Sequence, residues 1–199
     1  MCGISGIIEN KSNHNRIETV TRMLSRISHR GPDEAGIFHS NKATLGNVRL
    51  SIIDVSGGQQ PMSDQFGRYW IVFNGEIFNY IELKKDLDKK GIIFSTHSDT
   101  EVIVQLFSVY GKDCVNMLNG QFAFAIWDTR EESLFLARDR MGIRPLFYHH
   151  QNGIFTFGSE IKSIFENPEV KSNISFKNLS QVFTFWTSIT PYTAFQDIY

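Results

Sequence analysis

The sequence predicts an α+β domain built on antiparallel sheets, and two observations lead to this class. Residues 121–138 and 145–157 each read as two strand-like segments joined by a short polar turn, which is typical of β-hairpins. Residues 16–28, 79–90 and 100–110 instead repeat apolar side chains at steps of three and four, the pattern of helices with one buried face. Strands and helices do not alternate regularly, which argues against a doubly wound parallel sheet. A four-layer stack of helices on two packed sheets fits this pattern.

The remaining elements follow from local composition. Ile4, Ile7 and Ile8 among small residues predict a buried first strand, which would hold the start of the chain inside the fold. Further strands rich in β-branched and aromatic residues are predicted over 35–40, 43–53, 69–73 and 92–96. Shorter helices are predicted over 115–118, 160–166 and 176–185. Asn79 is the expected N-cap of the helix over 79–90, and Ser98 or Asp99 that of the helix over 100–110.

Composition limits the function classes. With 199 residues, of which 41% are apolar, the chain can bury a substantial core, and we expect one domain over residues 1–199. A formal net charge of −1 gives no general attraction to nucleic acid or to an anionic membrane, so a small-molecule partner is favoured. No run approaches the roughly 20 apolar residues that cross a bilayer. Cys2 and Cys114 make no disulfide framework, and the first residues do not form a signal peptide, which indicates a cytoplasmic protein.

Cys2 is the first candidate for chemistry. Removal of Met1 would leave an N-terminal cysteine, and the small residue at position 2 suits the aminopeptidase that clips methionine. Its thiol, with a free pKa of about 8.5, would then stand beside an α-amine of pKa about 7.7–8.0 that can act as general base. The competing interpretation is that Cys2 packs as a small buried hydrophobe, as cysteines commonly do.

The remaining polar residues give no indication of a metal or a cofactor site. The histidines show no metal-ligand spacing, so no metal is predicted, and no glycine-rich phosphate loop of the Walker type is present. Cys114 is most simply a packed core thiol. The charged cluster of Arg138, Asp139, Arg140 and Arg144 favours a structural ion-pair network or a domain contact over a nucleic-acid site.

Six segments in this order resemble a known family. They are Met1-Cys2-Gly3-Ile4-Ser5-Gly6, His29-Arg30-Gly31-Pro32-Asp33, Arg49-Leu50-Ser51-Ile52-Ile53-Asp54, Asn74-Gly75-Glu76-Ile77-Phe78-Asn79, Ser98-Asp99-Thr100-Glu101 and the run from Ala137 to Leu146. Together they resemble the glutaminase domain of glutamine-hydrolysing asparagine synthetases, a class II glutamine amidotransferase. The resemblance spans essentially the whole chain and implies an N-terminal-nucleophile hydrolase with an αββα sandwich.

The resemblance gives roles to residues that have simpler interpretations. Asn74-Gly75 alone would be a tight turn; the resemblance makes its side-chain amide and backbone N–H an oxyanion hole. Arg49 alone could be a surface arginine and Asp99 a helix cap. The resemblance places Arg49 on the α-carboxylate of glutamine, and Asp99 and Glu76 on the ammonium side. It also has backbone groups of Leu50, Ser51, Ile52 and Ile53 line the pocket, and it places the loop from His29 to Asp33 near the active site without a catalytic role for Arg30.

The resemblance implies hydrolysis of L-glutamine to glutamate and ammonia by Cys2, once Met1 is removed. Without that removal, Cys2 keeps an amide in place of a basic amine, and the alternative is a glutamine-binding or docking module that does not turn over. In the family the ammonia passes to a C-terminal synthetase domain that uses ATP and Mg²⁺, and the acceptor is chosen there. That domain is absent from residues 1–199, and we interpret Tyr199 as lying within a longer protein. Oligomeric state, a homodimer included, is left open.

Overall fold

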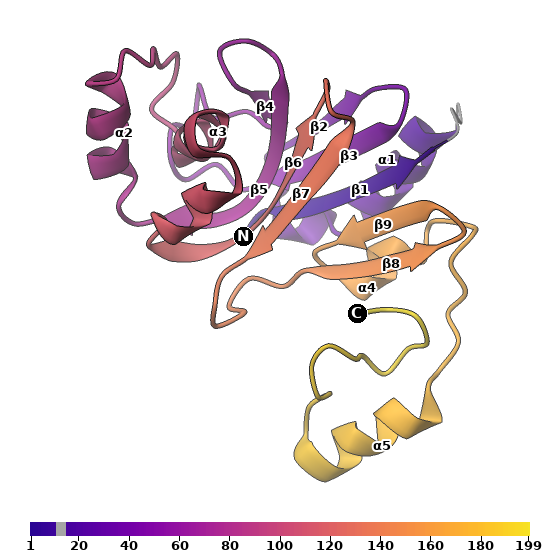
Figure 1. Ribbon diagram of the computed structural model, residues 1–199. Helices are drawn as coiled ribbons and strands as arrows, with labels where there is room; N and C mark the ends of the chain where they lie inside the picture. The colour runs from indigo at the N-terminus through magenta and orange to yellow at the C-terminus, as the bar shows by residue number, and fades with distance from the viewer. Residues whose placement is uncertain (11–14) are drawn as a thin grey trace.

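The computed structural model of the chain describes residues 1–10 and 15–199 and is shown in Figure 1. Its strands are β1 (Gly3–Glu9), β2 (Glu34–His39), β3 (Ala43–Arg49), β4 (Met62–Ser63), β5 (Tyr69–Ile77), β6 (Gly120–Asp128), β7 (Ser133–Arg138), β8 (Phe147–Gln151) and β9 (Ile154–Gly158). Its α-helices are α1 (Arg16–Arg26), α2 (Tyr80–Asp88), α3 (Asp99–Tyr110), α4 (Ile161–Ile164) and α5 (Phe176–Phe185), with short 3₁₀ helices at Ser28–Arg30 and Gly111–Asn116.

The strands form two antiparallel sheets, in the orders β2-β3-β1-β9-β8 and β4-β5-β6-β7. Helices α2 and α3 pack on the outer face of the second sheet, and α1 packs on the outer face of the first (Figure 1). Three apolar layers join these four layers of structure. The central layer, between the sheets, holds Leu45, Val72 and Trp127. The predicted four-layer αββα sandwich is therefore confirmed.

Strand β1 lies in the middle of the first sheet, between β3 and β9. Because side chains alternate across a strand, Ile4 joins the core between the sheets while Ile7 joins the layer under α1. Both isoleucines are buried, which confirms the predicted first strand and fixes the start of the chain within the fold. Gly3 pairs with Val48, so Cys2 lies just beyond the ladder, opposite the end of β3.

Two predicted strands are absent or shorter in the structure, and the strand predicted over 69–73 continues to Ile77 as β5. Residues 92–96 form no strand, because the backbone N–H groups of Ser95 and Thr96 donate to the carboxylate of Glu101, at 2.9 and 2.7 Å, instead of to a neighbouring strand. The strand predicted over 43–53 ends at Arg49, after which the chain turns away and the Ser51 N–H donates to Asp33.

The helix caps also differ in part. Asn79 occupies the N-cap position of α2, as predicted, but its side chain makes no capping hydrogen bond; its amide instead donates to the Met117 carbonyl and accepts from the Asn119 N–H. Ser98 is the N-cap of α3, since its hydroxyl accepts from the Thr100 N–H at 3.2 Å. Of the two predicted candidates, Ser98 is therefore the N-cap and Asp99 is the first residue of the helix.

The charged cluster at 138–144 forms no ion pair with any residue that the structure describes, and hydrogen bonds to the backbone hold it instead. The buried Asp139 carboxylate accepts hydrogen bonds from the backbone N–H groups of Phe122, Ile143 and Arg144. These bonds hold the pKa of Asp139 below its usual value even though burial opposes the shift. Arg138 in turn donates to the carbonyls of Gly142 and Arg144. The cluster therefore shapes the loop after β7.

The chain beyond β9 packs on one end of the first sheet. Ile164, Val170 and Ile198 form a small cluster there with Phe147 and Phe195. Helix α5 projects away from the sandwich (Figure 1) and exposes large side chains, including Phe176 and Phe183. None of the helices in the described part of the chain is long and apolar enough to cross a bilayer.

Candidate active site

Cys2 faces a cleft at one end of the two sheets. Its half-buried thiol lies against the backbone of Leu50, whose N–H points to the sulfur at 3.4 Å and whose carbonyl lies 3.7 Å from it. Cys2 directly precedes β1, which is paired on both sides within its sheet.

The loop from Arg30 to Asp33 clamps Cys2 to the end of β3. Arg30 Nε donates to the Cys2 carbonyl at 3.0 Å, and the Asp33 carboxylate accepts from the Ser51 N–H at 2.8 Å. Gly31 lies flat against β3, where a Cβ would come within 2.4 Å of the Val48 carbonyl carbon. The sequence placed this loop near the site, and the contacts show that it positions both sides of the cleft entrance.

Asn74 and Gly75 lie within β5 and not in a turn. Gly75 is opposite Phe122 in the β5–β6 ladder, and a Cβ on Gly75 would lie 2.2 Å from the Gln121 carbonyl oxygen. No other residue type fits at that spacing. The turn interpretation of Asn-Gly is therefore wrong, and the glycine is required by close packing of two strands.

The backbone N–H of Gly75 points toward the cleft. In an antiparallel ladder, opposite residues alternate between pairs that bond each other and pairs whose N–H and C=O groups point away. The Phe122 N–H donates to the Asp139 carboxylate at 3.2 Å, and the Phe122 carbonyl accepts from the Asp139 N–H at 2.8 Å. Both groups therefore point to the far side of β6, away from β5. The Gly75–Phe122 pair is thus of the second kind, and the Gly75 N–H faces the open edge of β5.

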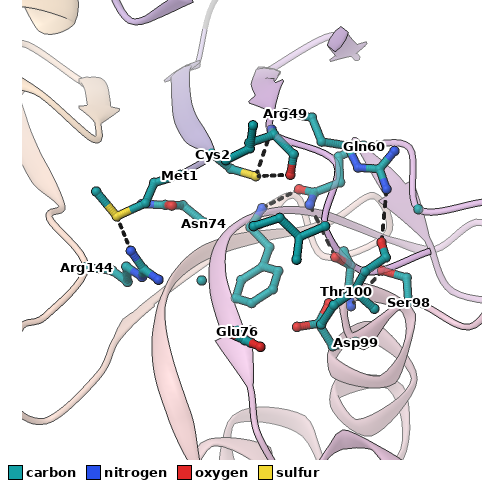
Figure 2. Close-up of a pocket in the computed structure, with 16 residues that line it drawn as sticks. Met1, Cys2, Arg49, Gln60, Asn74, Glu76, Ser98, Asp99, Thr100 and Arg144 are labelled. Carbon is teal, nitrogen blue, oxygen red and sulfur yellow. Dashed lines mark hydrogen bonds between the residues drawn. The ribbon is translucent and has the colours of Figure 1, made fainter. Parts of the chain in front are cut away.

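The amide of Asn74 is buried and unpartnered. The residue is 1% exposed, and neither its Oδ1 nor its Nδ2 has a hydrogen-bond partner among the described residues. An unpaired buried amide costs free energy, so such a group calls for a functional explanation. Figure 2 shows Asn74 and Cys2 among the residues of one cleft, and Gly75 lines the same cleft.

Arg49 lines the cleft with its guanidinium already in use. It pairs with Glu34 at 2.9 Å, and its two terminal nitrogens donate to the carbonyls of Ile53, Asp54 and Val55. These four bonds account for the four Nη hydrogens and leave the Nε hydrogen. The buried arginine therefore shapes the loop after β3 and brings positive charge to the cleft wall, while a bidentate grip on a ligand would require it to release these partners.

The start of α3 supplies the acidic wall. The Asp99 carboxylate accepts from the Ile77 N–H at 3.1 Å, and it lines the cleft with Glu76. Burial raises the pKa of Asp99 to about 6, backbone hydrogen bonds offset part of that rise, and the nearby charge of Glu76 adds to it. A buried carboxylate of raised pKa gains from a cationic ligand, which would favour its ionised form.

The structure brings nearly all of the predicted site residues together. Cys2, Arg49, Leu50, Ile52, Ile53, Asn74, Gly75, Glu76 and Asp99 line this single cleft, whereas Ser51 lies outside it with its N–H turned to Asp33. Sequence reasoning missed other lining residues: Met1, Gly58, Gln60, Phe73, Ser98, Thr100 and Arg144. Gln60 belongs to a loop that carries no motif, and Thr100, although it lies in the Ser98–Glu101 segment, had no predicted role, so only the tertiary structure reveals the contact between them.

Met1 is attached to Cys2 at the mouth of the cleft. Its side chain is about half exposed, and its sulfur contacts the Arg144 guanidinium (Figure 2). With Met1 in place, the Cys2 nitrogen is an amide and has no basic lone pair. Among the described residues, no group of three or more histidine, cysteine or acidic side chains is placed to hold a metal ion; His14 lies outside those residues.

Comparison with known proteins decides the family. The model of the glutamine amidotransferase domain matches residues 1–199. The chain belongs to this family. The amidotransferase domain is 40% identical over 196 residues to the glutamine-hydrolysing asparagine synthetase 3 of Bacillus subtilis, covering 97% of this chain and 32% of that protein. It is 37% identical over 220 residues to the putative asparagine synthetase 2 of Methanocaldococcus jannaschii, covering 42% of that protein.

A solved structure supports the same assignment. The amidotransferase domain matches the glutamine phosphoribosylpyrophosphate amidotransferase of B. subtilis with a TM-score of 0.68 and 25% sequence identity, over 82% of this chain and 43% of that one. The αββα sandwich is therefore the fold of that enzyme as well. The chain spans less than half the length of each of these three relatives.

Proposed function

We propose that the amidotransferase domain hydrolyses L-glutamine to glutamate and ammonia, with Cys2 as the nucleophile. The observation that carries this proposal is the buried, unpartnered Asn74 amide beside the edge N–H of Gly75, in the cleft that the Cys2 thiol faces. A donor pair held in advance next to a nucleophile is what acyl transfer requires, because charge develops on the carbonyl oxygen in the transition state.

Recognition of the zwitterion follows from the two walls of the cleft. We assign the ammonium group of glutamine to Asp99 and Glu76, since the buried Asp99 carboxylate gains most from a nearby cation. The α-carboxylate lies toward Arg49 and the backbone groups of the loop over residues 50–53. Arg49 contributes its charge, its Nε hydrogen and the shape of the loop that its other hydrogens hold.

The chemistry has two halves. The free amine of mature Cys2 accepts the thiol proton, and the sulfur attacks the carboxamide carbon of glutamine. The oxygen of the tetrahedral intermediate is held by Asn74 Nδ2 and the Gly75 N–H. The carbon–nitrogen bond then breaks, the amine returns its proton to the leaving nitrogen, and ammonia departs. Water, deprotonated by the same amine, attacks the thioester and releases glutamate and the thiol.

Cysteine variants test this proposal directly. Cys2→Ala is expected to bind glutamine but to release no glutamate. Cys114→Ala is the matched control, because Cys114 is fully buried and burial raises the pKa of its thiol to about 12, which leaves it unreactive. Glutamate release would be followed in both variants by a coupled dehydrogenase assay. Turnover by Cys2→Ala, or loss of turnover in a folded Cys114→Ala, would refute the assignment.

The state of the N-terminus decides between the two functional alternatives. Mass spectrometry of the purified chain, paired with its glutaminase rate, is expected to show activity that rises with the fraction lacking Met1. A fully active chain that retains Met1 would rule out the α-amine as base. A chain that retains Met1, binds glutamine and does not turn over would be the binding module.

We further propose that the ammonia supplies an amide-forming synthetase domain. This rests on the relatives, which are named as glutamine-hydrolysing asparagine synthetases and are more than twice as long as this chain. ATP and Mg²⁺ belong to that domain, which would be the protein partner here. Glutamine hydrolysis by residues 1–199 should accordingly continue at an unchanged rate in EDTA and without ATP, and a requirement for either would contradict this division of labour.

A further inference from the structure

The catalytic stretch of β5 lies at an open sheet edge. Strand β4 pairs with Trp70 and Ile71, and from Phe73 onward none of the described strands covers this side of β5. Three backbone N–H groups, those of Phe73, Gly75 and Ile77, alternate along that edge. The first donates to Gln60 Oε1 at 2.7 Å and the last to Asp99 at 3.1 Å. The Gly75 N–H lies between these two hydrogen-bonded N–H groups.

Gln60 is itself fixed on two sides. Its Nε2 donates to Thr100 Oγ1 at 3.2 Å, so both ends of its amide are used (Figure 2). Its backbone lies against β2, where a Cβ on Gly36 would come within 2.0 Å of the Gln60 carbonyl oxygen. Thr100 is buried in the first turn of α3, one residue after Asp99. One side chain thus ties the edge of β5 to the helix that supplies the acidic wall.

We propose that Gln60 is a positioning residue for glutamine hydrolysis. Its carboxamide holds the open edge of β5 against α3, so that the Gly75 N–H and the Asn74 amide keep the placement that the tetrahedral oxyanion requires. The inference rests on the proposed function. Its physical basis is that a displacement of about 1 Å at a reacting centre can cost roughly 100-fold in rate. On this uncovered edge Phe73 is held by two hydrogen bonds, one from its N–H to Gln60 and one from Asn47 to its carbonyl, and the bond to Gln60 is the one that connects the edge to α3.

The first test compares two adjacent glutamines. Gln60→Leu has one side-chain heavy atom fewer than glutamine and removes both hydrogen bonds. We expect kcat to fall by about tenfold or more, with KM changed by less than about threefold. Gln59→Leu is the matched control, since Gln59 is exposed and donates only to the Ser56 carbonyl; it should match the unmodified chain. Alkylation of Cys2 by iodoacetamide needs no oxyanion hole and should proceed equally fast in both variants.

A second pair of variants tests the other end of the bridge. Thr100→Val removes the acceptor for Gln60 and should lower kcat, whereas Thr100→Ser keeps the hydroxyl and should lose less. The double variant Gln60→Leu/Thr100→Val should be no slower than Gln60→Leu alone, because both changes break one connection. This series also carries the test if Gln60→Leu does not fold.

The outcomes separate the two proposals. An unchanged kcat in folded Gln60→Leu, with Cys2→Ala inactive, would overturn the role of Gln60 and leave glutamine hydrolysis standing. A rise in KM with kcat unchanged would make Gln60 a substrate contact and would equally overturn the positioning role. Turnover by Cys2→Ala would instead refute the proposed function itself.

Discussion

Replacing Asn74 by leucine should make the protein more stable and the enzyme nearly inactive. The two side chains have the same number of heavy atoms and the same branching, so the change mainly exchanges a polar amide for an apolar group. In the structure that amide is buried without a hydrogen-bond partner among the described residues. A buried donor or acceptor left unsatisfied costs about 1–3 kcal/mol, and leucine removes this cost.

The magnitude follows from that cost. A gain of about 1–2 kcal/mol corresponds to a rise in Tm of about 2–8 °C for a domain of this size. The loss of activity has the opposite sign. Removing one oxyanion donor lowers kcat by about 10²–10³-fold, with little effect on KM, because the bond forms only in the transition state. Calorimetry and a glutaminase assay on the same preparation measure both effects.

Asn47 provides the matched control. It is also a fully buried asparagine, and its Oδ1 likewise has no partner among the described residues, but its Nδ2 donates to the Phe73 carbonyl at 3.2 Å and so links β3 to β5. Asn47→Leu would leave that carbonyl unpaired and should lower Tm. If Asn74→Leu lowered Tm as Asn47→Leu does, or if it kept full activity, the argument that the Asn74 amide is held unpaired for catalysis would be refuted.

Three further changes have defined outcomes. Gly75→Ala would place a Cβ 2.2 Å from the Gln121 carbonyl oxygen and should cost several kcal/mol in urea unfolding, about 3 kcal/mol or more for a strand forced apart. For Asp99, burial raises the pKa in the folded state from 3.8 to about 6, so the folded state loses stability as pH rises from about 4 to 6. Asp99→Asn avoids this loss and should therefore be about 3 kcal/mol more stable than the unmodified chain at pH 7, with a higher KM for glutamine. For Glu160, hydrogen bonds from Arg30, Lys162 and His29 outweigh burial and lower its pKa to about 2, so the stabilisation is present above pH 4.5 and lost toward pH 2; Glu160→Gln should be less stable at pH 7, and the difference should vanish at the acid end.

The sheets were predictable because their signals are local. The hairpin β6–β7 alternates apolar and small residues around a polar turn, and that pattern is sufficient to define a paired strand. The segment over 92–96 has the same β-branched and aromatic composition but forms no strand, because Glu101, five residues away in the next helix, takes the N–H groups of Ser95 and Thr96. Composition specifies an extended segment, and tertiary contacts decide which partner receives its hydrogen bonds.

The site was predictable to the extent that its residues lie in recognisable segments. Gln60 lies outside these segments and Thr100 lies within one without a predicted role, because the contact between the two side chains depends on where the opposite element lies. The position of Arg49 was predictable, but its partners were not, because Glu34 and the carbonyls over residues 53–55 meet it only after the loop has closed on itself.

The Asn-Gly pair shows why the site lies where it does. In most contexts this dipeptide favours a turn, and a strand interior penalises glycine through lost side-chain packing and greater chain entropy. Here the pairing with β6 leaves no room for a side chain at Gly75, and Asn74 stays buried without a partner. An unpaired buried amide alone does not mark a site, since Gln105 in α3 has one too and does not line the cleft. The distinguishing feature of β5 is that the costs of Asn74, Gly75 and the buried Asp99 carboxylate all fall within one cleft, beside the thiol of Cys2.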